Sequence, residues 1–135
     1  MNAVLVDTNI LSYSFKGDSK AKAYARILEH DTVLYSFQTR AELEFWALHR
    51  NWGDHKKAEL ERFLKPYSLV PHTPETSIHW AHAMHAAQQA GRRMLSDDAW
   101  IAATALELGI PLVTHNKKDF LGLADLEIIS FQEDG

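Results

Sequence analysis

Short apolar runs alternate along this chain with segments of helical periodicity, and this alternation limits the possible folds more than any other feature. The apolar runs lie at residues 3–6, 32–36, 68–70, 111–114 and 126–131. They are short and largely apolar on both faces, as strands are when both sides of their sheet are covered. Strands that alternate with helices form parallel sheets. We therefore predict a three-layer α/β/α sandwich with a short, mainly parallel five-stranded sheet.

Capping and breaking residues mark the ends of the predicted helices. Helical periodicity is found at about 10–16, 21–28, 40–50, 54–64, 74–90 and 98–108. Asp7-Thr8-Asn9 is expected to cap the first of these helices, and Ser96-Asp97-Asp98 the last. Gly91 and Gly109 are expected to end the last two. A polar tail follows at 133–135.

Length and composition exclude several classes of protein. With 135 residues, we expect residues 1–135 to form a single domain. The chain has no cysteine, which excludes a disulfide scaffold, a Cys-ligated metal site and a thiol nucleophile. No apolar run approaches ~18 residues and no secretory signal is visible at the start, so we expect a cytoplasmic protein without a membrane segment. The formal net charge of −4 is unexpected for a nucleic-acid binder, which is usually basic.

Polar side chains gather where the predicted strands end. Asp7 follows the first strand, Thr39 and Glu42 lie just beyond the second, and Asp98 begins a helix with an apolar continuation. Three more polar residues follow the fourth strand, namely Thr114, Asn116 and Asp119. Ligands of parallel sheets bind beyond the carboxyl ends of the strands. We therefore expect four carboxylates from distant segments to converge there: Asp7, Glu42, Asp98 and Asp119.

A set of carboxylates this close would need a neutralising partner. They repel one another unless protons or a cation neutralise them. Oxygen donors suit Mg²⁺ or Mn²⁺, and such an ion can activate water for phosphodiester hydrolysis. The four acids match the formal charge of −4, so a bound cation would remove the objection to an RNA substrate. Taken singly, each acid also fits a plainer role, since Asp often caps helices and a helical Glu is usually solvated.

Four segments resemble, in order and spacing, the motifs of the PIN-domain ribonucleases, and of their VapC toxin branch in particular. The segments are Val4-Leu5-Val6-Asp7-Thr8-Asn9-Ile10-Leu11, Ser36-Phe37-Gln38-Thr39-Arg40-Ala41-Glu42-Leu43, Asp98-Ala99-Trp100-Ile101-Ala102-Ala103-Thr104-Ala105 and Leu112-Val113-Thr114-His115-Asn116-Lys117-Lys118-Asp119-Phe120. Each motif is weak alone, whereas the set of four is specific and covers nearly the whole chain.

The resemblance implies a Mg²⁺-dependent endoribonuclease that acts as the toxin of a toxin–antitoxin pair. Its implied partners are an RNA substrate, a small VapB-like antitoxin protein and a second copy of the chain, as a homodimer or within a larger toxin–antitoxin assembly. The implied reaction is attack of metal-activated water on phosphorus, which leaves a 3′-hydroxyl and a 5′-phosphate. It needs no Ser or His nucleophile, and the sequence contains no convincing catalytic triad.

The resemblance also assigns roles to residues by position. Asp7 and Asp98 match the primary metal ligands, and Glu42 and Asp119 complete the acidic quartet. Three polar residues match positions that support the site: Thr8, Thr114 and Asn116. Some relatives have a carboxylate where this chain has Asn116, so the fourth metal-binding position is either Asp119 or Asn116.

Two other functions stay open at this point. One is a PIN-like RNA-binding domain that is not a toxin or not catalytic, which the presence of all four acids disfavours. The other is an aspartyl-phosphate phosphatase or receiver domain, which also has an Asp at a strand end. Such phosphatases usually have a second Asp two residues after the nucleophile, where this chain has Asn9.

Several further residues have two interpretations. The three histidines at 79, 82 and 85 do not share one helix face, so we expect them to be solvated or packed rather than to bind a metal. Lys117-Lys118 and Arg92-Arg93 flank the acids in sequence and either bind RNA phosphates or are solvated. Arg40 either pairs with Glu42 or binds phosphate, and His115 either contacts substrate or is a plain loop residue.

Overall fold

The computed structural model describes residues 2–132, and the tail predicted at 133–135 lies outside them. The sheet has five strands in the order β3-β2-β1-β4-β5, and every pairing is parallel. The strands are β1 (Ala3–Val6), β2 (Thr32–Ser36), β3 (Ser68–Val70), β4 (Leu112–Val113) and β5 (Ile128–Ile129). The predicted fold class is therefore confirmed, although β4 and β5 are shorter than the apolar runs that predicted them.

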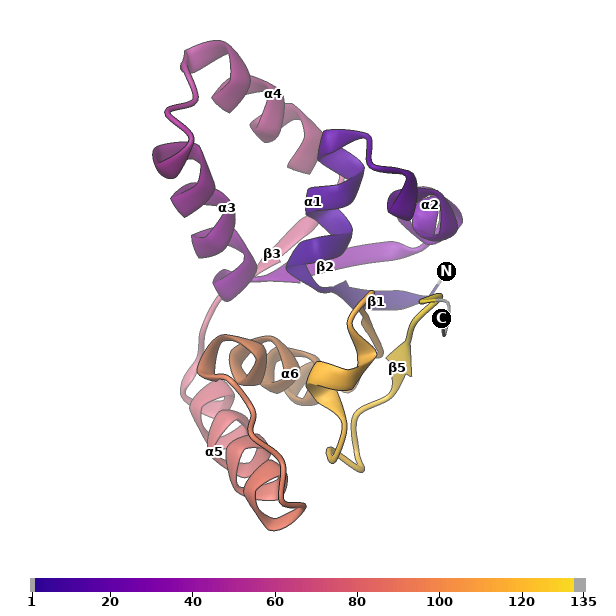
Figure 1. Ribbon diagram of the computed structural model, residues 1–135, viewed down its shortest axis with the longest axis vertical. Helices are drawn as coiled ribbons and strands as arrows, with labels where there is room; N and C mark the ends of the chain where they lie inside the picture. The colour runs from indigo at the N-terminus through magenta and orange to yellow at the C-terminus, as the bar shows by residue number, and fades with distance from the viewer. Residues whose placement is uncertain (1, 133–135) are drawn as a thin grey trace.

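Helices cover both faces of this sheet (Figure 1). They are α1 (Thr8–Lys16), α2 (Ala25–His30), α3 (Phe37–His49), α4 (Asp54–Leu64), α5 (Pro74–Gln89) and α6 (Ser96–Leu108), with 3₁₀ turns η1 (Ser19–Tyr24) and η2 (Lys117–Phe120). In the described part of the chain, no helix is long and apolar enough to cross a membrane.

Two predicted helix starts were wrong, each for a local reason. Helix α3 begins at Phe37 rather than at residue 40, because the Ser36 side chain accepts a hydrogen bond from the Thr39 backbone N–H and so caps the helix earlier. Helix α6 begins at Ser96 with Leu95 as its N-cap residue, so Asp98 lies within the first turn and does not cap it. The acids at that turn still interact favourably with the helix dipole.

The core has two parts, one on each face of the sheet. On one face, Leu5 of β1 packs with buried residues of α5 and α6. On the other face, Val4 and Val6 pack with Leu11 of α1, Leu43 of α3 and residues of α4. Successive residues of a strand point to opposite faces, so β1 contributes to both parts.

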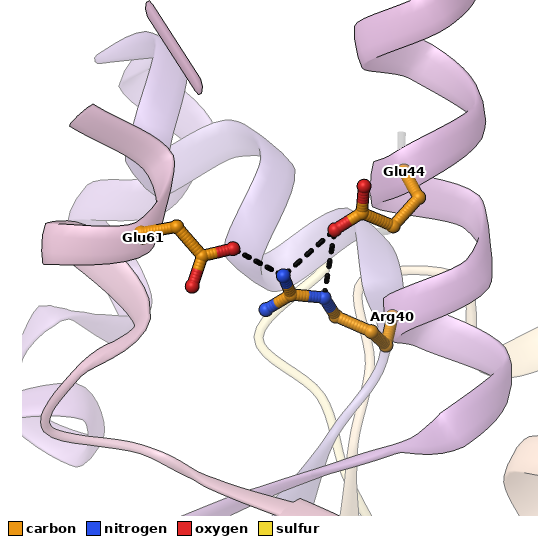
Figure 2. Close-up of polar contacts among 3 residues, drawn as sticks. All are labelled: Arg40, Glu44 and Glu61. Carbon is orange, nitrogen blue, oxygen red and sulfur yellow. Dashed lines mark hydrogen bonds and ion pairs between the residues drawn. The ribbon is translucent and has the colours of Figure 1, made fainter. Parts of the chain in front are cut away.

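Helices α3 and α4 lie on the same side of the sheet as α1, away from α5 and α6 (Figure 1). Arg40 of α3 links the two helices: its Nε donates to Glu44 Oε1 at 2.9 Å, and its guanidinium also pairs with Glu61 of α4 (Figure 2). Arg40 therefore does not pair with Glu42, one of the two partners predicted for it, and the phosphate alternative stays a prediction. Its role is to connect two helices at the surface.

Candidate functional site

One surface pocket of about 320 Å³ brings the four predicted acids together at the carboxyl ends of β1 and β4. It is lined by Asp7, Thr8, Asn9, Ser12, Tyr13, Lys16, Glu42, Trp46, Asp98, Asn116 and Asp119. The predicted supporting residues Thr8 and Asn116 are among them. The predicted convergence is thus found in the structure, and the catalytic roles of these residues stay predictions.

Asp7 is held by hydrogen bonds to both carboxylate oxygens. It directly follows β1 and is the N-cap residue of α1, and only 6% of its surface is exposed. Its Oδ1 accepts from the Thr8 backbone N–H at 2.8 Å, and its Oδ2 accepts from the Thr114 hydroxyl at 2.7 Å. The pKa of Asp7 is raised to about 6, mainly by burial and also by the charges of Glu42 and Asp119, while these hydrogen bonds oppose the rise.

Thr114 lies beneath the pocket and connects Asp7 to the loop after β4. It is fully buried, and its hydroxyl oxygen accepts from the Asn116 backbone N–H at 3.0 Å while its hydrogen is donated to Asp7. The Asp119 backbone N–H in turn donates to the Asn116 carbonyl oxygen at 3.0 Å. The orientation of Asp7 and the path of the chain toward Asp119 therefore depend on one buried hydroxyl.

A chain of hydroxyl groups orients Glu42. The Thr8 hydroxyl donates to Glu42 Oε2 at 2.7 Å and lies 2.9 Å from the Thr39 hydroxyl. Because Thr8 has one hydroxyl hydrogen, Thr39 must be the donor to Thr8. Burial raises the pKa of Glu42, as does the charge of Asp97, whereas hydrogen bonds from Thr8 and Gln38 lower it.

Asp98 is placed by the most deeply buried helix of the fold. After Asp98, the α6 residues Ala99, Ile101, Ala102 and Ala103 are all buried. The pKa of Asp98 is raised to about 7. Burial is the largest cause, and the charges of Asp97, Asp7, Asp119 and Glu42 add to it. The negative groups of the pocket thus act on one another.

In the described part of the chain, these four acids form no ion pair with a basic side chain. Lys16 lines the pocket, but its Nζ lies 4.9 Å from the centre of the Trp46 ring. The pocket therefore contains a concentration of negative charge that only protons or an external cation can neutralise.

The donor set fits a hard divalent cation, although the side chains are not drawn together around one. Oxygen is the only donor type that the acids and Asn116 offer, which suits Mg²⁺ or Mn²⁺. Over residues 2–132, no three or more His, Asp or Glu side chains are arranged so that they hold a metal ion. Binding would require the carboxylates to move closer to one another.

Sequence reasoning missed several residues of this pocket. Asn9, Ser12, Tyr13 and Lys16 come from one face of α1, and their helical spacing is the signal that would have found them. Trp46 lies four residues after Glu42 on α3, at the same kind of spacing.

The other basic and histidine residues do not join the site. His79 and His82 line a separate pocket of about 370 Å³ with Asp125, and His85 lines a third pocket, which agrees with the expectation that the three share no face. Arg92 donates to the Lys118 carbonyl oxygen at 2.8 Å, so it braces the loop of η2.

Comparison with known proteins identifies the family. The PIN domain model matches residues 4–126. The chain is 29% identical over 125 residues to Ribonuclease VapC1 of Haemophilus influenzae strain R2866, covering 91% of this chain and 93% of that protein. It is 23% identical over 124 residues to Ribonuclease VapC2 of Rickettsia felis, covering 90% and 92%.

Solved structures agree at the level of the fold. VapBC-1 from nontypeable Haemophilus influenzae matches with a TM-score of 0.82 at 26% identity, covering 95% of this chain and 97% of that one. VapBC2 from Rickettsia felis, solved bound to a DNA fragment from its promoter, matches with a TM-score of 0.84 at 20% identity, covering 96% and 99%. With the family model spanning most of its length and the sheet order and acidic pocket described above, the chain belongs to the PIN-domain family.

Proposed function

We propose that this chain is a metal-dependent endoribonuclease and the toxin of a toxin–antitoxin pair. The observation that carries the proposal is a pocket of four carboxylates that, among residues 2–132, form no ion pair with Lys or Arg. The full-length likeness to proteins named as VapC ribonucleases supports RNA as the substrate. An aspartyl-phosphate mechanism is less favoured, because Asn9 stands where a second Asp is usual.

In this proposal Asp7 and Asp98 bind Mg²⁺ or Mn²⁺, and Glu42 and Asp119 complete the acidic set. The bound ion would supply a Lewis acid for a phosphoryl oxygen and would activate water for hydrolysis. Thr114 orients Asp7, and Thr8 orients Glu42, through the hydrogen bonds described above. Without the cation the same acids repel the RNA backbone, so substrate and ion are required together.

The proposed protein partner is a small VapB-like antitoxin. Structures with this fold include VapBC toxin–antitoxin complexes. Two large apolar side chains of α3 are exposed, Phe45 at 60% and Leu48 at 71%, and they are suited to contact a partner. Assembly as a homodimer and a cytoplasmic location also stay proposals.

The test of the enzymatic function is RNA cleavage by the purified chain, with mapping of the new 5′ ends. We expect cleavage of total RNA in Mg²⁺ that yields 5′-phosphate ends, stops in EDTA and falls by at least about a hundredfold in Asp98→Asn. Asp125→Asn is the matched control, since Asp125 is an exposed acid outside the pocket.

Three outcomes would oppose this proposal. Cleavage that survives in Asp98→Asn would exclude the acidic pocket as the active site. RNA binding without metal-stimulated cleavage would indicate a binding module. A phosphorylated Asp7 during turnover would indicate the aspartyl-phosphate mechanism. For the toxin role, induced expression should stop bacterial growth for the wild type and not for Asp98→Asn.

A further inference from the structure

A second pocket adjoins the acidic one, and we propose that it holds the base of a single-stranded RNA nucleotide next to the cleaved phosphate. This inference rests on the proposed ribonuclease function for its substrate class. The pocket has a volume of about 430 Å³ and is lined by Ser19, Lys20, Ala23, His115, Phe131 and Gln132. We call it the base pocket.

His115 of the base pocket contacts two residues that line the acidic pocket, Asn9 and Tyr13. His115 follows Thr114 directly, and its backbone N–H donates to Asn9 Oδ1 at 3.4 Å. The His115 ring also packs edge-on against Tyr13, with 5.8 Å between ring centres. Asn9 and Tyr13 line the acidic pocket, so an RNA strand whose phosphate lies over the acids passes directly to the base pocket.

Phe131 gives the base pocket an available aromatic surface. Its ring packs against Tyr24 at 5.3 Å between centres, yet 48% of Phe131 stays exposed. Stacking of bases on aromatic rings is a general means of binding single-stranded nucleic acid. An exposed ring beside a candidate phosphodiester site is therefore suited to a base.

Buried Tyr24 holds the two aromatic walls of the pocket in place. Its hydroxyl oxygen accepts from the Phe131 backbone N–H at 3.0 Å and lies 2.8 Å from His115 Nδ1. Among the described residues, Nδ1 is the acceptor in contact with the Tyr24 hydroxyl hydrogen, and a buried hydroxyl donor needs one. In the tautomer in which Nδ1 accepts the Tyr24 hydroxyl hydrogen, the ring hydrogen of His115 lies on Nε2, where it can donate to a base acceptor. Tyr24 is thus a positioning residue.

Lys20 supplies the charge that distinguishes a nucleotide from a simple apolar ligand. Its Nζ lies 5.0 Å from the centre of the Tyr13 ring, at the boundary of the two pockets. Its ion pair with Asp18 is long, at 3.7 Å, and half of its side chain is exposed, so the ammonium is accessible to a phosphate. A cation beside an aromatic surface is the combination that single-stranded RNA requires.

The test is a binding cycle that varies both the protein and the RNA. Fluorescently labelled ten-nucleotide oligouridine and an abasic ribose-phosphate strand of equal length are titrated in Mg²⁺ with the full chain carrying Asp98→Asn, so that the acidic pocket is less negative and the RNA is not cleaved, and anisotropy is measured. We expect Phe131→Ala to weaken oligouridine binding roughly tenfold and to leave binding of the abasic strand within about twofold. Equal weakening of both strands, or no weakening of either, would overturn the base pocket.

Control variants separate stacking from folding. Phe131→Leu keeps apolar contact with Tyr24 but lacks a ring, so it should lose oligouridine binding as Phe131→Ala does, whereas Phe131→Tyr should retain it. Phe45→Ala removes another exposed phenylalanine, on α3, and should leave the binding of both strands unchanged. Lys20→Met should weaken the binding of both strands equally and reduce the salt dependence of binding by about one phosphate contact.

Cleavage kinetics separate this inference from the proposed function. In Mg²⁺, Phe131→Ala should raise KM about tenfold and change kcat less than about threefold, as expected when a contact is made equally in ground and transition states. If the wild type cleaves no RNA, the proposed function fails, while the binding cycle still decides whether the pocket holds a base. If cleavage is normal and the cycle shows no coupling, the base pocket alone is wrong.

Discussion

Asp7 and Asp98 reach the acidic pocket from buried parts of the chain, whereas Glu42 and Asp119 reach it from elements nearer the surface. Asp7 directly follows the central strand, and Asp98 lies in the first turn of a helix whose next residues are buried. The Glu42 side chain on α3 is partly exposed, as is that of Asp98 on α6, and Asp119 is exposed on η2. We call these the inner pair and the outer pair.

The difference between the two pairs shows which carboxylates are least favourable in their charged form. The pKa of Asp7 is raised to about 6 and that of Asp98 to about 7, with burial as the main cause in both. A cation would relieve the inner pair most, because burial and the charges of the other acids raise these two pKa values clearly above the ordinary value of 3.8. We therefore expect the inner pair to bind the ion most directly and the outer pair to adjust it.

The largest expected effect comes from comparing one acid of each pair. Asp7→Asn should reduce RNA cleavage by at least about a hundredfold, while Asp119→Asn should reduce it by about tenfold, as for groups that act on a metal through others. Initial rates over a Mg²⁺ titration provide the measurement. Asp119→Asn should recover activity at higher Mg²⁺, and Asp7→Asn should not. Equal losses that no Mg²⁺ concentration restores would remove the distinction between the pairs.

The inner pair was also the part of the site most accessible to prediction from sequence. Asp7 follows an apolar strand and Asp98 precedes an apolar helix, so the topology alone brings them to the same edge of the sheet. The same topology placed Glu42 and Asp119 beyond the second and fourth strands, and the four motifs resembling PIN-domain proteins assigned them to one acidic quartet.

Sequence reasoning could not predict the hydrogen bonds between side chains of distant segments. The hydroxyl chain from Thr39 through Thr8 to Glu42 needs α1 and α3 side by side, and the Tyr24–His115 contact joins residues 91 positions apart. The start of α3 was wrong because Ser36 was assigned to the strand alone, although its side chain also caps the helix. Arg40 has two acids near it in the sequence, Glu42 and Glu44. Its pairing with Glu61 depends on the packing of α4 against α3, which the sequence did not show.

A smaller effect should follow when the support of the inner pair is removed and its acids are kept. Thr114→Val deletes the hydroxyl that donates to Asp7 and accepts from the Asn116 N–H. Because both groups are buried or partly buried, we expect a loss of about 1–3 kcal/mol in the free energy of unfolding and roughly a tenfold loss of cleavage. Chemical denaturation and initial rates measure the two effects.

Thr104→Val is the matched control for this substitution. Thr104 is also buried, but its hydroxyl donates to the Trp100 carbonyl within α6. It should change stability modestly and leave cleavage within about twofold of the wild type, since its bond lies within one helix. A similar loss of cleavage in both variants would mean that general destabilisation explains the Thr114 result.

The raised pKa of Asp98 predicts how stability depends on pH in the metal-free chain. The folded state keeps this proton up to about pH 7, whereas the unfolded chain loses it near the ordinary value of 3.8. Folded protein therefore binds more protons between about pH 4 and pH 7, and stability falls as pH rises through that window. Asp98→Asn removes this loss, so its Tm in EDTA should exceed that of the wild type by roughly 4 °C at pH 8 and by nothing at pH 4.

Mg²⁺ should act on stability in the same direction as Asp98→Asn. Thermal unfolding of the wild type should shift upward with Mg²⁺ at pH 8 and little at pH 4, where protons already neutralise the pocket. Asp125→Asn should follow the wild type throughout. A stabilising effect of Asp98→Asn that is equal at both pH values would show that burial of the charge is not its cause.

The smallest effect is expected at the surface link between α3 and α4, which tests how far the outer pair depends on its surroundings. Arg40→Gln breaks the ion pairs with Glu44 and Glu61, all of which are partly or largely exposed. Exposed pairs contribute about 0–1 kcal/mol, and the buried side chains Leu60 and Leu64 still anchor α4 to the core. A double-mutant cycle of Arg40→Gln with Glu61→Gln, measured by denaturation, should give a coupling energy below about 1 kcal/mol that decreases in salt.

Cleavage by Arg40→Gln should stay within about twofold of the wild type, because Thr8 and not Arg40 orients the Glu42 carboxylate. A tenfold loss of cleavage at unchanged stability would contradict this expectation. It would mean that the surface ion pairs of Arg40 control the position of α3 and therefore of Glu42.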